Sequence, residues 1–177
     1  SINVKTIEEA KSAFAHAKNY SRKIIVERFI TGYDFRILVI NHRFIAAALR
    51  EPAHVIGDGK ATIQDLIDLE NKDPRRGYGH ENVLTEISID KETDDQLTKY
   101  GYSLETVLKN NEKCYLKGTA NLSTGGTSTD VTDIVHPHNI FICERISRVI
   151  GLDICGIDIM ATNLSEPLQT TGGVILE

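Results

Sequence analysis

At 177 residues the chain is long enough to bury a hydrophobic core, and its 41% hydrophobic and 25% charged residues are ordinary values for one globular domain. The net charge of −5, with no lysine- or arginine-rich block, argues against nucleic acid as a partner. There is no apolar run long enough to span a membrane and no signal-like N-terminus, so we expect a cytoplasmic protein without a membrane partner.

The N-terminal part of the sequence predicts one helix followed by an antiparallel meander. Thr6 and Glu9 form a capping-box pattern, and apolar residues at helical spacing predict a helix over about 7–19. Three runs rich in β-branched and aromatic residues follow, and they predict strands at 23–30, 34–40 and 43–50.

A second module is predicted after Pro52, as an insertion over about 54–117. A Gly-Asp-Gly turn precedes a short helix capped by Thr62, and a charged loop follows at 73–81. We expect a weak strand after residue 85, a helix near 92–100, a helical turn at "SLETVL" and a strand at "KCYLK".

The C-terminal part returns to longer elements. An amphipathic helix is predicted over 139–151 and ends at Gly151, and strands are predicted at 152–161 and at the final "VILE". The fold class is therefore α+β, with helices packed on an antiparallel sheet and a small inserted α/β module. Because the sequence stops within a predicted strand, we expect it to be a segment of a longer polypeptide.

Three cysteines, Cys114, Cys143 and Cys155, are present in a pattern without CxxC spacing. Such a pattern favours reduced thiols over a disulfide framework or a zinc site. The sequence His136-Pro137-His138 has a spacing that two metal ligands can use, but a turn leading into the next helix is the better interpretation.

Asp158 is the residue that points most directly to chemistry. In "LDICGIDIMA" the carboxylate lies in the middle of an apolar strand, where desolvation is costly unless a cation or partner is present. Gly156 on the same face leaves room for an approaching group, and Glu177 ends the next strand. Two acids on neighbouring strands are compatible with a Mg²⁺ site. An equally good alternative is that one or both are edge residues that face water.

Two further stretches are compatible with a nucleotide site. Asp34 and Arg36 share one face of a predicted strand, where the acid could accept from ribose hydroxyls and the arginine could reach phosphate. The stretch "KGTANLSTGGTSTD" at 117–130 is small and polar enough to surround a phosphate. Taken alone, each stretch has a simpler alternative. Asp34 and Arg36 could belong to a solvent-facing hairpin, and 117–130 could be a flexible surface loop.

Taken together, these stretches resemble the C-terminal lobe of the ATP-grasp ligases, and within that superfamily they are most similar to the ATP-grasp domain of the cyanophycin synthetases. The resemblance covers essentially the whole chain, 1–177. It rests on "VERFITGYDFRILVI", "PAHVIGDGKATIQDLI", "DPRRGYGHENVLT", "TANLSTGGTSTDVTD" with "HPHN", and "GLDICGIDIM" before "GGVILE".

The resemblance implies a role for each matching residue. Glu27, Arg28, Phe29 and Ile30 match the segment that contacts adenine, and Asp34 matches the acid that binds ribose. Arg36 matches a basic residue that stabilises the transferred phosphoryl group or the substrate carboxylate, with Arg50 as a weaker candidate. Asp158 and Glu177 match the magnesium ligands, and the loop at the acyl-phosphate is matched by Asn121, Ser123, Thr124, Gly125 and Gly126.

The resemblance also implies what the whole protein does. With ATP and Mg²⁺, it would add aspartate to an aspartate-arginine polymer primer through an acyl-phosphate, as part of a homo-oligomer. The N-terminal ATP-grasp lobe, with its phosphate-binding lysines, and the Mur-ligase-like domain that adds arginine are absent from this chain. We therefore expect the isolated chain to fold at least in part and to be inactive.

Two other functions stay open, a glutathione-synthetase-like ligase and a non-catalytic nucleotide-binding module. The motifs "HPHN" and "GLDICGIDIM" favour the cyanophycin synthetases over the glutathione-synthetase-like ligases. His80 with Arg75 and Arg76 could dock an acidic polymer, although a solvated loop is the better interpretation of that stretch.

Overall fold

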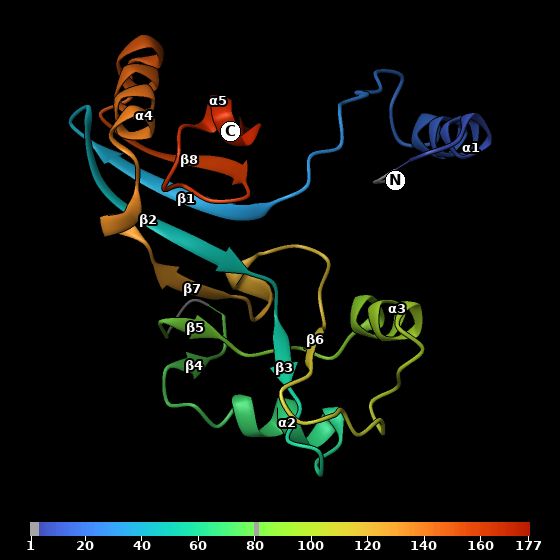
Figure 1. Ribbon diagram of the computed structural model, residues 1–177. Coiled ribbons are helices and arrows are strands. Elements are labelled where there is room, and N and C mark those ends of the chain that lie inside the picture. Colours follow the sequence, from blue (N-terminus) through green and yellow to red (C-terminus); the bar gives the residue numbers. More distant parts are fainter. Residues whose placement is uncertain (1–3, 80–81) are drawn as a thin grey trace. The chain divides into compact units, whose positions relative to one another are not determined.

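The computed structural model describes residues 4–79 and 82–177, so His80 lies outside the described residues. The chain forms two compact units, Ser1–Thr31 and Gly32–Glu177 (Figure 1). Along the described residues, none of the helices combines the length and the apolar character needed to cross a lipid bilayer.

The first unit consists of the predicted helix and an irregular segment. Helix α1 (Ile7–Lys18) begins with the expected capping box, in which the Glu9 N–H donates to Thr6 Oγ1 at 3.1 Å. The strand predicted at 23–30 is wrong, since none of these residues is in a strand. A strand is stable only beside a hydrogen-bonded neighbour, and Ile25 and Val26 are instead more than 80% exposed.

The second unit is built on a five-stranded antiparallel sheet in the order β7-β2-β1-β8-β9. Its members are β1 (Tyr33–Ile40), β2 (Arg43–Glu51), β7 (Thr127–Asp130), β8 (Ile154–Ala161) and β9 (Val174–Ile175). Asn41 and His42 join β1 to β2, and both have positive φ, as a tight two-residue hairpin requires. The flexible-loop alternative for 117–130 is wrong for its last four residues, "TSTD", because they form β7 and pair with β2.

One face of this sheet is covered by helices α4 (Pro137–Ile150) and α5 (Leu168–Thr171) (Figure 1). His136 caps α4, accepting the His138 N–H at 3.1 Å, which confirms the turn interpretation of "HPH". Gly151 ends the helix with φ +78°. The apolar core beneath contains Phe35, Ile37, Val39, Ala47, Val135, Cys143, Ile157, Ile159, Ala161, Leu164 and Leu168.

Residues 52–117, between β2 and the loop that leads into β7, form a module with its own apolar core, called the inserted module below. It contains β3 (His54–Ile56), α2 (Ile63–Glu70), β4 (Arg76–Gly77), β5 (Leu84–Thr85), α3 (Lys91–Lys99) and β6 (Lys113–Tyr115). Strands β3 and β6 pair antiparallel, and β4 and β5 pair parallel. Its core contains Ala53, Val55, Ile63, Leu66, Ile67, Ile87, Leu97, Leu108, Cys114 and Leu116.

Two short 3₁₀ helices complete the unit, η1 (Leu122–Thr124) and η2 (Thr132–Ile134). The turn predicted at "SLETVL" is present as a single turn, in which the Thr106 N–H donates to Ser103 O at 3.0 Å. Val107, at the end of the stretch, forms an isolated antiparallel bridge with Thr62 at the N-terminus of α2.

Candidate active site

Charged side chains gather on the sheet face opposite α4. In an antiparallel sheet, directly opposed residues point to the same face. Asp34 lies between Arg50 on β2 and Met160 on β8, and Arg36 lies opposite Asp158. The alternating residues of β1, beginning with Phe35, are buried on the core face. The structure therefore brings together four of the predicted site residues, Asp34, Arg36, Arg50 and Asp158.

These four side chains form one ion-pair network. Arg50 donates from Nε and Nη2 to Asp34 Oδ1, at 2.8 Å and 2.6 Å, and its Nη2 lies 3.1 Å from Asp158 Oδ2. Arg36 Nε lies 2.7 Å from Asp158 Oδ1, and its side chain is nearly half exposed. Two arginines thus face two carboxylates, and Arg36 is the more accessible of the two cations.

The network holds Arg50 firmly in its charged form. Burial alone would lower the pKa of Arg50, but the hydrogen bond and charge of Asp34 and the charge of Asp158 outweigh it, so the pKa is raised. Arg50 is a fixed positive charge on this face.

Asp158 Oδ1 is held by an ion pair and not by a hydrogen bond. It is buried and lies 2.7 Å from Arg36 Nε, but no hydrogen bond with good geometry reaches it within the described residues. A buried carboxylate oxygen in this position favours a cation beside it, and in this structure that cation is the partly exposed Arg36 guanidinium. The donor set therefore fits a hard cation such as Mg²⁺, which takes oxygen ligands.

Glu177 lies beside Asp158 through backbone hydrogen bonds. The Asp158 N–H donates to Glu177 O at 2.9 Å, and the Leu176 N–H donates to Asp158 O at 2.8 Å. Two residues at the end of β9 thus oppose one residue of β8, as in a β-bulge. Within the described residues, no group of three or more His, Cys, Asp or Glu side chains surrounds a metal position. The structure thus places the backbone of Glu177 beside Asp158, and the assignment of the two side chains to a magnesium site stays a prediction.

The space beside Gly156 is filled by Arg36. A Cβ added at Gly156 would collide with Arg36 Nη1 and lie 3.0 Å from its Cδ. Gly156 was expected to leave room for an approaching group, and the group in this structure is the Arg36 guanidinium. The glycine lets this side chain lie flat across β8 towards Asp158.

The loop at residues 121–126, called the small-residue loop below, is closed by hydrogen bonds to Asn121. Asn121 O accepts the N–H groups of Thr124 and Gly126, both at 3.2 Å, and Asn121 Oδ1 accepts the Ser123 N–H at 3.1 Å. The hydroxyls of Ser123 and Thr124 also donate to Asn121, at 2.8 Å and 3.0 Å. These donors were expected to surround a phosphate, and in this structure they are used inside the loop, three of them in long and therefore weak bonds.

A cavity of about 450 Å³ lies between the sheet and the inserted module. Asp34, Arg50 and Met160 line it from the sheet, and Gln96 of α3 and Tyr100, which follows α3, line it from the module. Residues 118–120, which lead into the small-residue loop, also border it. The inserted module is therefore part of the wall of the candidate site, which the sequence did not indicate.

Glu27, Arg28, Phe29 and Ile30 belong to the first unit, in an irregular segment. The structure does not place them with the residues of the sheet. Their assignment to adenine binding stays a prediction.

Two buried cations near the small-residue loop were missed by sequence reasoning. Lys117 has a fully buried side chain, and its Nζ bonds to Asp90 Oδ2 at 2.6 Å. A solvated loop was the better interpretation of residues 73–81, with Arg75 and Arg76 as docking charges the alternative, and both are wrong for Arg76, whose side chain is only 3% exposed. Arg75 is largely exposed and pairs with Asp73 at 2.7 Å. Lys117 follows the buried Leu116, two residues after the end of β6, and that position was a sequence signal for it.

No family model matches the chain, but individual proteins do. The chain is 51% identical over 178 residues to the cyanophycin synthetase of Synechocystis sp., covering 99% of this chain and 20% of that protein. It is 35% identical over 170 residues to the glutathione biosynthesis bifunctional protein GshAB of Clostridium perfringens, covering 96% of this chain and 22% of that protein. The chain spans about a fifth of the length of the curated relatives it matches.

A solved structure shares the fold. The crystal structure of a bifunctional glutathione synthetase from Pasteurella multocida superposes with a TM-score of 0.71 at 28% identity, over 93% of this chain and 22% of that chain. The α+β prediction, an antiparallel sheet with helices packed on it, is confirmed. The chain is an ATP-grasp ligase segment related to part of cyanophycin synthetase.

Proposed function

We propose that this chain forms the C-terminal lobe of the ATP-grasp domain in a ligase that extends an aspartate-arginine polymer. The full protein would add aspartate to the polymer's C-terminal carboxylate, and arginine would be added by a separate, Mur-ligase-like domain. The observation that carries the proposal is the charged face of Asp34, Arg36, Arg50 and Asp158, in a chain 51% identical to part of a cyanophycin synthetase.

The chemistry would take place in two steps. A carboxylate oxygen of the polymer attacks the γ-phosphorus of ATP, the bond to ADP breaks, and an acyl-phosphate forms. The amine of aspartate then attacks the acyl carbon, phosphate leaves, and the amine loses a proton as the amide forms. Negative charge develops on phosphoryl oxygens, so catalysis needs fixed positive charge at that position.

Arg36 is placed to supply that charge. Its partly exposed guanidinium can exchange Asp158 for a phosphate or carboxylate, because an arginine binds all three with the same planar donors. Arg50 is held by Asp34 and would contribute a fixed positive field. Both hydrogen bonds from Arg50 go to Asp34 Oδ1, so Asp34 can still offer its Oδ2 to ribose hydroxyls.

Asp158 and Glu177 are the residues that would hold Mg²⁺, with Asp158 Oδ1 released from Arg36 and Glu177 following the adjacent strand. When bound with nucleotide, Mg²⁺ would neutralise charge on the phosphate oxygens. The small-residue loop, through Ser123, Thr124 and the glycines Gly125 and Gly126, would border the acyl-phosphate. Residues Glu27–Ile30 would contact adenine.

The test is ADP release by the full-length protein that contains this chain, with Mg-ATP and one of two substrate pairs. Aspartate with an aspartate-arginine primer should support turnover, and γ-glutamylcysteine with glycine should not. Turnover with the second pair alone would replace the proposal with the glutathione route. The isolated 177 residues should release no ADP, because the phosphate-binding lysines of the superfamily would come from outside this segment.

The second candidate, a glutathione-synthetase-like ligase, is supported by the relatives with 35% and 28% identity. The higher identity to cyanophycin synthetases, 47% to 51%, favours the polymer reaction. A non-catalytic nucleotide-binding module is less well supported, because it does not require the two arginines and two carboxylates of the charged face.

A further inference from the structure

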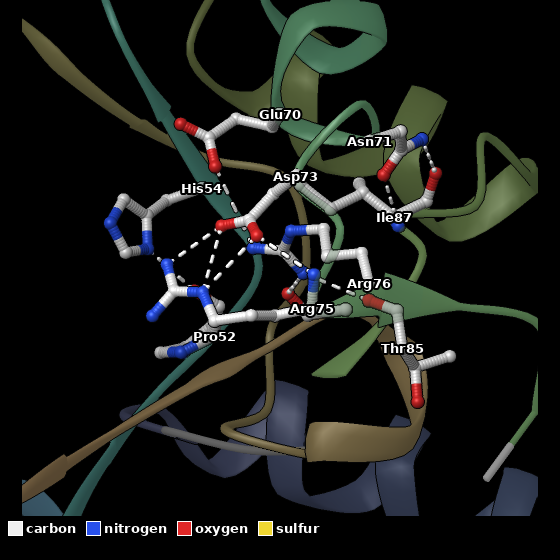
Figure 2. A network of polar contacts seen from close by, with 10 residues as sticks. Pro52, His54, Glu70, Asn71, Asp73, Arg75, Arg76, Thr85 and Ile87 are labelled. Carbon is white, nitrogen blue, oxygen red and sulfur yellow. Dashed lines mark hydrogen bonds and ion pairs between the residues drawn. The ribbon is translucent and has the colours of Figure 1, made fainter. Parts of the chain in front are cut away.

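The inserted module places one arginine beneath the small-residue loop. Arg76 lies on β4, whose two residues pair with Leu84 and Thr85 of β5. Its side chain is 3% exposed, whereas that of the preceding Arg75 is 69% exposed. Figure 2 shows the two guanidinium groups pointing to different partners, Arg75 to Asp73 and Arg76 to the backbone of Thr85.

The bonds of Arg76 connect the module to the loop. Nη1 donates to Thr85 O at 2.8 Å and to Gly125 O at 3.0 Å, so one nitrogen bridges residues from two segments that are 40 positions apart in the sequence. The bond to Gly125 is itself buried. The guanidinium of Arg76 is thus a direct link between β5 and the loop.

The charge of Arg76 is poorly compensated for a buried ion. Glu70 Oε2 lies 3.8 Å from Nη2 and belongs to a half-exposed side chain. The Arg76 Nε is buried, and no hydrogen-bond partner for it is present within the described residues. Because an apolar residue of similar volume is usually as stabilising as a buried ion pair, stability alone does not account for an arginine here. Its bond to Gly125 O is what an apolar residue could not provide.

A second contact holds the loop at the same position. A Cβ on Gly125 would lie 2.8 Å from the Ile87 Cα, so the loop backbone packs directly on Ile87. Asn71, at the end of α2, in turn binds both backbone groups of Ile87, at 2.8 Å and 3.0 Å (Figure 2). Gly126 packs equally closely on Glu51 O, at the end of β2. The loop is therefore fixed between the module and the sheet.

We propose that Arg76 is a positioning residue, which holds residues 121–126 of the small-residue loop at the candidate active site through the carbonyl of Gly125. The inference rests on the proposed function for its catalytic consequence, but its structural part stands independently. Arg76 acts through the loop and contacts no reacting group. The inserted module would then act on the reaction by fixing the loop, besides forming a wall of the cavity.

The test compares Arg76→Met and Arg76→Lys with the matched control Arg75→Met in the full-length protein. The first readout is hydrogen exchange of the amides of Ser123, Thr124, Gly125 and Gly126, which needs no activity. These amides should exchange about tenfold faster in Arg76→Met, less so in Arg76→Lys, and as in the wild type in Arg75→Met. Unchanged exchange in both Arg76 variants would overturn the proposal.

The second readout is the kinetics of ADP release. Arg76→Met should lower kcat about 10- to 100-fold with the KM for ATP unchanged, because misplacing a loop by about 1 Å has effects of this size. Arg75→Met should stay within about twofold of the wild type. Combined with Ser123→Ala, the Arg76→Met effect should be non-additive, since both changes act on one loop. Additive effects on kcat would also overturn the proposal.

The two proposals fail in different ways. If the wild-type protein releases no ADP with either substrate pair, the proposed function is wrong, and the amide exchange still decides whether Arg76 positions the loop. If the wild type is active and the loop amides are unaffected by Arg76→Met, the positioning proposal alone is wrong.

Discussion

The central sheet and the inserted module both use arginines, but in opposite ways. On the sheet, Arg36 and Arg50 meet the carboxylates of neighbouring strands on the face opposite α4, and Arg36 is nearly half exposed. In the module, Arg76 is buried and bonds to backbone carbonyls. A carboxylate partner can be exchanged for a phosphate, whereas a buried carbonyl partner cannot. The sheet arginines are therefore placed to exchange their partners for a ligand, as the proposed function requires, and the module arginine is placed to hold a backbone segment.

The largest effect is expected when the carboxylate of Asp158, which contacts both sheet arginines, is removed. Asp158→Asn keeps the shape of the side chain but removes the charge shared by Arg36 and Arg50. We expect ADP release by the full-length protein to fall about 10²- to 10³-fold, since one preorganised electrostatic group has effects of this order. The midpoint of thermal unfolding should change by only a few degrees.

Steady-state kinetics and a thermal melt of the same preparation measure both effects. Asp133→Asn, on a residue of η2 away from the network, is the matched control and should behave as the wild type. An active Asp158→Asn protein would contradict the assignment of Asp158 to the site.

Gly156→Ala tests how the sheet holds Arg36. The added Cβ would collide with the guanidinium, and because the end of an arginine side chain can move, the backbone should stay in place. We expect ADP release to fall about 10- to 100-fold through misplacement of Arg36, with the free energy of unfolding changed by less than about 1 kcal/mol. A large loss of stability with normal activity per folded molecule would show that Gly156 serves packing instead.

Gly125→Ala tests the module in the same manner, at the position where the loop meets Ile87. Here the neighbour is backbone and φ is +93°, so neither side can yield easily. We expect a loss of about 2–3 kcal/mol in the free energy of unfolding, from backbone strain and the collision together. Gly101→Ala is the control, since it has φ +74° but nothing within 4 Å of its Cβ, and it should lose about 1 kcal/mol. Equal losses in the two variants, measured by urea unfolding, would show that φ alone matters.

The sequence predicted the sheet face better than it predicted the module, for a physical reason. Period-two alternation placed Asp34 and Arg36 on one face, and the apolar context of Asp158 marked it as unusual, because both are local properties of a strand. The capping box of α1 and the Thr62 cap of α2 were likewise local signals. Each of these predictions depended on residues within a few positions of one another.

The predictions that failed depended on distant partners. The run at 23–30 has strand composition, but no neighbouring strand pairs with it in the described chain. Arg76 stands in a charged loop sequence, and it is buried because Gly125, 49 positions away, lies against it. The donors of the small-residue loop were expected to face a ligand, and their use by Asn121 depends on the turn that the loop adopts. Local composition carries no information on such contacts.

The two apolar cores can be followed separately, because each contains one buried cysteine. Burial raises the pKa of Cys143, in the sheet core, to about 12 and the pKa of Cys114, in the module core, to about 11. In a Cys155→Ser background, each thiol should react with an alkylating reagent only when its own core opens.

Lys117→Met should then affect one core and not the other. The change removes a buried cation but leaves Asp90, which is half exposed and can be hydrated. We expect a loss of about 1 kcal/mol, below that of a fully buried pair, and about fivefold faster alkylation of Cys114. Cys143 should be labelled at the wild-type rate. Equal acceleration of both thiols would show that the sheet and the module unfold as one unit.

The smallest expected effect is the pH dependence of the same ion pair. The hydrogen bond from Lys117 holds the pKa of Asp90 below its usual value, with a smaller contribution from the N–H group of Thr93. A carboxyl group with a lowered folded-state pKa stabilises the fold above its unfolded pKa of about 3.9, and this stabilisation is lost as the pH falls through the folded-state value. Between pH 6 and pH 3, amide exchange at Cys114 and Leu116 should therefore lose slightly more protection in the wild type than in Asp90→Asn. Because Asp90 is half exposed, the difference should stay below about 1 kcal/mol. The same difference at Cys143 would mean that acid acts on the whole unit, and the contrast between sheet and module would not extend to their stability.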